Sequence, residues 1–150
     1  MVYLKTYKLF ESLDKSGVDE ICKKLKINDF LYEIDLEGVV TTKQDLWWDD
    51  KNLDEIPFKM NVFGNFFCNG NNLKSFKNLE KVKRFYCFDN PVYRLWILFN
   101  DEDKIEMFND YDIIRNEDSD EPIVVLDRLN AFLEEIGKPK VTDVKGYKCI

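Results

Sequence analysis

Apolar and polar residues follow the same order three times in the middle of the chain. The three units begin at Leu46, Phe66 and Phe85, so they are offset by 20 and 19 residues. Each unit is apolar at its first, third and eighth positions, which are occupied by Leu46, Trp48 and Leu53, then Phe66, Cys68 and Leu73, then Phe85, Cys87 and Val92. A repeat at this period predicts that each unit forms one layer of a stacked architecture.

The pattern within each unit is typical of a leucine-rich repeat. Asparagine holds the sixth position in two units, as Asn71 and Asn90, whereas Lys51 takes it in the first. We expect the first three residues of each unit to form a short parallel strand. The asparagine amide can then bond backbone groups that the following bend leaves unpaired. The segments between the units are expected to return on the far side of the core, and their apolar residues include Met60, Val62, Leu79 and Val82.

The chain before the repeats is expected to cap them. Residues 3–26 have helical spacing, and Ser16 with Asp19 resembles a capping box that starts a second helix. Residues 30–43 alternate apolar and polar positions around Glu37 and Gly38, which predicts a hairpin. A solenoid end would otherwise expose its core, so we expect this hairpin to cover the first repeat.

The chain after the repeats is expected to form a helical cap. Apolar residues recur at helical spacing over 92–99 and again over 105–111. Pro122 is expected in the first turn of a further helix that ends before Gly137, followed by an irregular or short extended tail over 141–150. The prediction is therefore one α/β domain over 1–150. It has N-terminal helices and a hairpin (1–44), a short leucine-rich-repeat solenoid of about three repeats (45–92) and a C-terminal helical cap with its tail (93–150).

The composition and net charge of the chain disfavour some classes of partner. The chain is 45% hydrophobic and 34% charged, as in globular proteins, and its net charge is −7. This charge disfavours nucleic acid and anionic membranes as partners. No stretch has the length and apolarity of a membrane span or a signal peptide, so we expect a cytoplasmic protein. Because disulfides are rare in the cytoplasm, we expect the four cysteines to be free thiols.

The sequence offers little for catalysis. It contains no histidine, which removes the commonest general base and metal ligand, and its six glycines form no phosphate-binding loop. The acidic clusters lack the spacing of a calcium loop. We therefore expect no enzyme, no cofactor and no metal.

Strand alternation predicts a surface instead. If the third residue of each unit points inward, then Trp47, Phe67 and Tyr86 point outward and stack as a ladder across neighbouring strands. Arg84 and Phe88 hold flanking outward positions. Tryptophan, tyrosine and arginine are the residues that dominate protein-binding hot spots. Two alternatives remain open: a terminal cap covers these rings, or the register differs by one residue and the two faces are exchanged.

An acidic segment provides a second candidate. Residues 100–121 contain ten acidic residues against Lys104 and Arg115. Such a segment could imitate a nucleic-acid backbone and occupy a basic groove of a nucleic-acid enzyme. Its candidate contacts are Asp101, Glu102, Asp103, Glu106, Asp110 and Asp112.

The repeats also resemble a known group of proteins. Residues 62–76, VFGNFFCNGNNLKSF, are similar to the repeats of small leucine-rich-repeat proteins of tailed bacteriophages. Residues 8–11, 112–115 and 126–133 resemble the same proteins, although the first unit departs from them at Trp47, Trp48 and Lys51. The resemblance implies a phage accessory protein in the host cytoplasm that binds, and modulates or inhibits, a host or anti-phage defence protein such as a CRISPR or other immune nuclease. A phage structural or assembly component, which would self-associate, is the other possibility.

Overall fold

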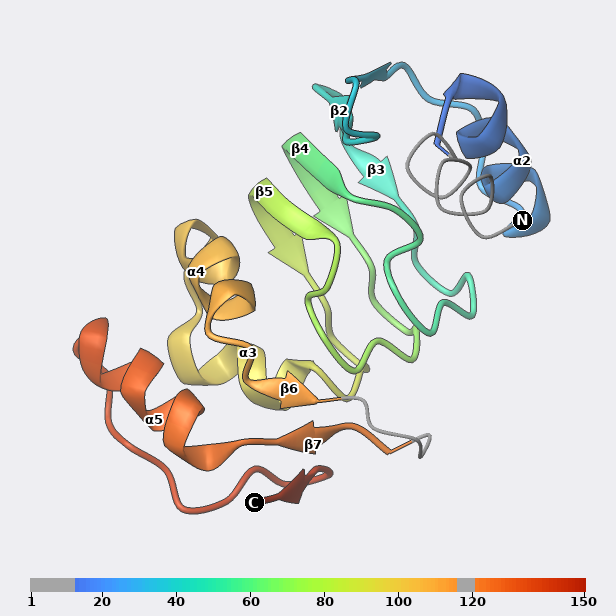
Figure 1. Ribbon diagram of the computed structural model, residues 1–150. Coiled ribbons are helices and arrows are strands. Elements are labelled where there is room, and N and C mark those ends of the chain that lie inside the picture. The colour runs from blue at the N-terminus through green and yellow to red at the C-terminus, as the bar shows by residue number, and fades with distance from the viewer. Residues whose placement is uncertain (1–12, 116–120) are drawn as a thin grey trace, which may run out of the picture.

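A curled, mostly parallel sheet forms the centre of the protein in the computed structural model, which describes residues 13–115 and 121–150. Helix α2 (Lys15–Lys24) lies at one end of this sheet. Helices α3 (Tyr93–Phe99), α4 (Ile105–Asp110) and α5 (Leu126–Glu135) lie at the other end (Figure 1). The chain is thus a mixed α/β protein, as predicted.

The register of the sheet follows the sequence repeat. Strand β4 (Met60–Phe67) pairs in parallel with β5 (Leu79–Tyr86) and with β3 (Leu46–Trp47). Phe66 is opposite Leu46 on one side and Phe85 on the other. The predicted alignment of the three units is therefore confirmed residue for residue.

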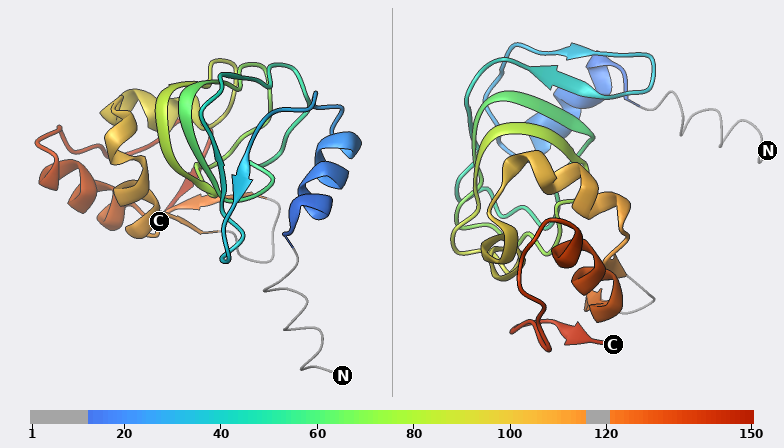
Figure 2. Two further views of the ribbon diagram at one scale, coloured as in Figure 1. Left: turned by 90° about the horizontal axis from the view of Figure 1, so that it is seen from above. Right: turned by 90° about the vertical axis from the view of Figure 1, so that its left-hand side faces the viewer.

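The strands are longer than predicted. We expected three-residue strands and placed Met60, Val62, Leu79 and Val82 in return segments, but these residues lie in the first halves of β4 and β5. Buried positions alternate along β4, at Met60, Val62, Gly64 and Phe66. The inward face of β4 therefore begins at Met60, ahead of the predicted start of the strand at Phe66. The sheet curls around the core along this whole length (Figure 2).

The first layer of the sheet is split into two strands. The predicted hairpin is present, because β1 (Glu33–Ile34) pairs antiparallel with β2 (Val40–Thr42). However, β2 also pairs in parallel with the first half of β4, while β3 pairs with the second half. The hairpin is therefore part of the sheet rather than a separate cap, and the boundary that we predicted at residue 44 falls inside a layer.

Asparagine side chains organise the bends after the strands, as predicted. The Asn71 Oδ1 accepts from the backbone N–H groups of Lys51 and Leu53, both at 3.0 Å, and its Nδ2 donates to the Trp48 and Cys68 carbonyls. In the next layer, the Asn90 Oδ1 accepts from Leu73 N at 2.9 Å. Each amide thus joins its own layer to the one before it.

The N-terminal helix begins earlier than the predicted capping box. Asp14 is the N-cap of α2, and its carboxylate accepts from Gly17 N at 2.8 Å. The capping role assigned to Ser16 is therefore wrong, because Ser16 already lies inside the helix. The helix predicted nearer the N-terminus falls largely outside the described residues.

The C-terminal region contains a second small sheet that the sequence did not indicate. Strand β7 (Ile123–Val124) pairs with β6 (Ile114–Arg115) and with β8 (Lys148–Cys149), the latter in the tail that we expected to be irregular or extended. Pro122 precedes β7, so the helix start predicted there is wrong, and α5 begins at Leu126. Pairing within this sheet holds residues 123–124 in an extended conformation.

One contiguous core joins these parts. Phe76 packs against Phe85 in the sheet, Phe99 in α3 and Phe108 in α4, with ring centroids 6.1, 5.6 and 5.1 Å away. Buried residues of α2 and α5 belong to the same cluster. The outward face of the sheet is therefore held on a rigid base.

Candidate protein-binding surface

Three aromatic side chains, Trp47, Phe67 and Tyr86, form a continuous stack on the outward face of the sheet; we call them the aromatic row. The Trp47 and Phe67 rings lie 3.9 Å apart at an interplanar angle of 5°, and the Phe67 and Tyr86 rings lie 4.7 Å apart at 6°. Each ring comes from the same register position of its strand. Parallel pairing in this register stacks the three rings.

The two alternatives for this surface are decided by burial. Trp48, Cys68 and Cys87, the predicted inward residues, are all buried, so the faces are not exchanged. Trp47 is 65% exposed, so no cap formed by residues 13–115 or 121–150 covers that end of the row. Phe67 and Tyr86 are half-buried, and the stacking neighbours of Phe67 lie against both of its faces.

The stacking determines which parts of the rings a partner can contact. Rings this close and this parallel present their edges to solvent, and a further ring would need roughly twice the observed spacing to insert between them. Proteins that bind single-stranded nucleic acid offer open ring faces on which bases stack. Here neighbouring rings cover both faces of Phe67 and one face each of Trp47 and Tyr86, which suits side-chain packing better than a run of bases.

A polar ladder beside the rings fixes their strands. The Asp49 carboxylate accepts from Asn69 N at 2.7 Å, and the Asn69 Oδ1 accepts in turn from Phe88 N at 2.8 Å. Asp45 accepts from Asn65 N at 2.7 Å in the same manner. These side chains hold neighbouring layers together, so the surface is ordered before any partner arrives.

The other two predicted contact residues lie next to the row rather than in it. Phe88 is 55% exposed and packs on Tyr93 at 4.8 Å and 37°. Arg84 is exposed on β5. Both line a hollow of about 370 Å³ at the outer edge of β5, together with Tyr86, Tyr93, Trp96, Asn100 and Glu102. Sequence reasoning missed Tyr93, Trp96 and Asn100, because they follow the end of the repeat, and it predicted Glu102 only as part of the acidic segment.

The acidic candidates are divided among different roles. Glu102 accepts from Phe85 N at 3.2 Å, Asp101 accepts from Asp103 N at 3.0 Å, and Asp112 forms an ion pair with Arg128 at 3.1 Å. Asp103, Glu106 and Asp110 are exposed. Part of the acidic segment, residues 116–120, lies outside the described residues. Half of the predicted acidic contacts therefore already serve the fold.

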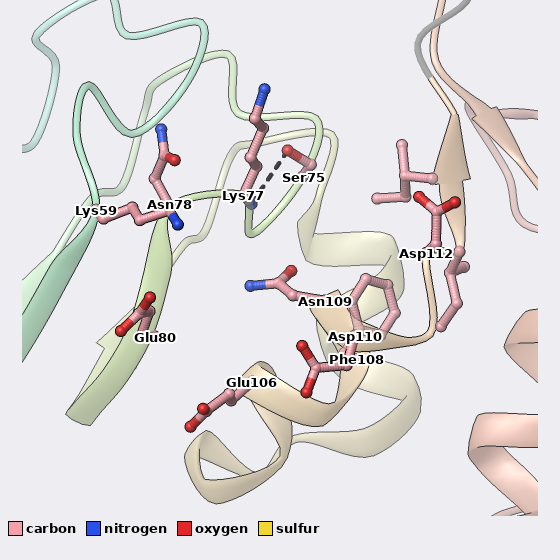
Figure 3. Close-up of a pocket in the computed structure, with 12 residues that line it drawn as sticks. Lys59, Ser75, Lys77, Asn78, Glu80, Glu106, Phe108, Asn109, Asp110 and Asp112 are labelled. Carbon is pink, nitrogen blue, oxygen red and sulfur yellow. Dashed lines mark hydrogen bonds between the residues drawn. The ribbon is translucent and has the colours of Figure 1, made fainter. Parts of the chain in front are cut away.

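Lysines accompany these acids. A cavity of about 400 Å³ lies between α4 and the loop before β5. Figure 3 shows Glu106, Asp110 and Asp112 on one side of it, and Lys59, Lys77 and Glu80 on the other. Asn109 also lines this cavity, and its amide donates to the Phe76 and Leu79 carbonyls, both at 3.0 Å. The mixed charges differ from the unbroken negative surface of a nucleic-acid mimic.

Two of the four thiols, Cys68 and Cys87, are buried in the repeats. Burial raises the pKa of Cys87 to about 12 and also raises that of Cys68, so both thiols stay protonated at neutral pH. Within residues 13–115 and 121–150, no three side chains that commonly bind metals are grouped together. In the same residues, no helix has the length and apolarity needed to cross a membrane.

Comparison with known proteins gave no relative. No protein-family model matches the chain, no curated protein matches its sequence, and no solved structure matches its fold.

Proposed function

We propose that this chain is a non-catalytic protein-binding module of the leucine-rich-repeat type, which binds its partner through the aromatic row, Phe88 and Arg84. The observation that carries the proposal is the stacked row itself, with Trp47 65% exposed at one end. Exposed rings that are already ordered lose little conformational entropy on binding, and burying their edges contributes apolar area.

The repeat architecture supports this role. Layers offset by 20 and 19 residues pair in register, and Asn71 and Asn90 bond across them. Leucine-rich repeats build extended surfaces that commonly bind other proteins. The division of the first layer between β2 and β3 and the register shifts between β4 and β5 depart from a regular repeat.

The proposed partner is a host or anti-phage defence protein. This step rests on the resemblance of residues 62–76 to phage leucine-rich-repeat proteins. A phage accessory protein in the host cytoplasm would act by covering a functional surface of that partner, for example on a CRISPR or other immune nuclease. Inhibition by occupation needs no catalytic group on this chain.

The first test is affinity capture from a host-cell lysate with mass spectrometry at low and high salt. We expect one stoichiometric partner that remains bound at high salt, because apolar contacts are not screened. The double variant Trp47→Ala and Tyr86→Ala should abolish capture while shifting the thermal midpoint by only a few degrees, since Trp47 is exposed and Tyr86 half-buried.

Phe63→Ala is the matched control. Phe63 is 52% exposed on the same strand as Phe67 but lies outside the stack, so its loss should leave capture intact. Equal loss of capture in both variants would contradict a role specific to the row. Binding that disappears at high salt would favour the acidic segment instead, and stable self-association without a captured protein would favour an assembly component.

A further inference from the structure

The aromatic row stops at a position that another ring could occupy. One face of Tyr86 is covered by Phe67, at 4.7 Å and 6°. Strand β5 ends the sheet on this side, and α3 and the 3-10 helix Glu102–Lys104 follow where another strand would lie (Figure 1). Each strand contributes one ring to the stack, so the next ring would lie over the other face of Tyr86.

The hollow at the edge of β5 borders this position, because Tyr86 is one of the residues that line it. Its volume is about 370 Å³, within the size range of sites that bind small ligands. Five aromatic residues are among those that line it, from β5, the bend after it and α3, although two of them, Phe85 and Trp96, are buried: Phe85, Tyr86, Phe88, Tyr93 and Trp96. A planar ring inserted here would contact Tyr86 and extend the row.

Polar groups of both signs surround the hollow. Arg84 and Glu102 contribute one positive and one negative charge, and Asn100 adds an amide. The Glu102 Oε2 accepts from Phe85 N at 3.2 Å, which replaces a bond that a further strand would make and holds the carboxylate at the rim. The balanced charge suits a neutral ring, while the carboxylate and amide oxygens can accept a hydrogen bond from it.

The neighbouring acids argue against a nucleobase. Asp101 and Asp103 flank Glu102 in the sequence, and the Asp101 carboxylate is held by Asp103 N. A nucleotide would bring its phosphate close to these carboxylates, and repulsion would oppose its entry. An aromatic side chain of a protein brings no such charge.

We propose that this hollow receives a tryptophan or tyrosine side chain of the protein partner, stacked on Tyr86 as a fourth ring of the row, with its N–H or O–H directed to Glu102 or Asn100. The proposal rests on the proposed function, because it assigns the specificity of the same surface. It makes the partner's aromatic residue the anchor of the complex.

The test is titration of the isotope-labelled protein with N-acetyltryptophanamide, followed by NMR. We expect saturable shifts at the Asn100 side-chain amide and around Tyr86 and Phe88, and much weaker changes with N-acetylleucinamide. Asn100→Gly should raise the dissociation constant at least fivefold without unfolding the protein, because Asn100 has φ 47°, which glycine adopts freely. Tyr86→Leu should weaken binding similarly, whereas Phe63→Ala, which lies on β4 outside the stack, should leave it unchanged.

Several results would overturn the proposal. These are equal binding of the leucine probe, shifts centred on Trp47, no saturation, or tighter binding of N-acetylargininamide or adenosine monophosphate. Capture of the lysate partner distinguishes failure of the hollow as the anchor from failure of the row as the binding surface. Normal capture by Asn100→Gly would reject the hollow as the anchor and leave the row as the binding surface. Saturable binding of the tryptophan probe without any captured protein would instead reject the proposed function.

Discussion

At the scale of single residues, buried amides hold the layers in place. Asn90 is 7% exposed, and its Nδ2 donates to the Cys68, Cys87 and Phe88 carbonyls while its Oδ1 accepts from Leu73 N. These backbone groups lie at a bend where sheet pairing has ended. Because they are mostly buried, most of them cannot form hydrogen bonds with water. One side chain thus satisfies four groups that would otherwise destabilise the fold.

Replacing this amide should be costly. We expect Asn90→Ala to lower the free energy of unfolding by about 3 kcal/mol, because each buried group left without a partner costs roughly 1–3 kcal/mol and some regain water. Urea denaturation would measure the change. Asn72→Ala is the control, since Asn72 is exposed and its amide donates to the exposed Asp54 at 3.1 Å; its loss should cost less than about 0.5 kcal/mol. Equal effects of the two variants would contradict the structural role of Asn90.

At the scale of elements, the divided first layer depends on a close backbone approach. Gly64 lies in β4 where the register shifts between Val62 and Asn65, beside the residues that separate β2 from β3. A Cβ at Gly64 would lie 2.6 Å from the Gln44 carbonyl carbon and oxygen. Only glycine leaves room for the chain to pass from β2 to β3 along β4.

Gly64→Ala should therefore disturb the sheet through contact rather than backbone conformation. We expect a loss of roughly 2–3 kcal/mol of stability, typical of a side chain forced into a filled site. Gly146→Ala is the matched control: it has φ 88° and open space, so it should cost only about 1 kcal/mol of backbone strain. Comparison of the two denaturant midpoints would check this. A Gly64 variant no less stable than the control would show that the first layer adjusts freely.

At the scale of the whole molecule, contacts distant in sequence tie the C-terminal region to the repeats. The Tyr147 hydroxyl donates to the Lys74 carbonyl at 2.7 Å, across 73 residues. The C-terminal strand β8 pairs with β7, and the Phe132 ring of α5 packs on Phe99 and Phe108 at 5.3 and 5.4 Å. A shared core of this kind favours unfolding as one cooperative unit.

Cooperative unfolding can be checked with two probes. Tryptophan fluorescence and far-UV circular dichroism should give coincident urea transitions, because Trp47 and Trp48 report the sheet and Trp96 the start of the C-terminal region. Tyr147→Phe should shift both curves equally, by about 1 kcal/mol for one lost hydrogen bond. A shift confined to one probe, or two separate transitions, would show that the C-terminal region unfolds independently.

The sequence by itself determined the register of the three layers, the positions of the bridging asparagines and the outward row of Trp47, Phe67 and Tyr86. These features follow from a repeated local pattern, in which strand alternation assigns each residue to a face and the period aligns one layer with the next. The hairpin around Gly38 was predictable for the same reason, because its signals are adjacent in the chain.

Tertiary structure alone decided the rest. The joining of β2 to β4, the second sheet, the start of α5 and the hollow beside Tyr86 depend on contacts between distant segments. Glu102 shows the reason: its acidic neighbours suggested a charged surface, yet its carboxylate bonds the edge of a strand 17 residues earlier. Local pattern fixes which face a residue takes, whereas packing between segments selects its partner.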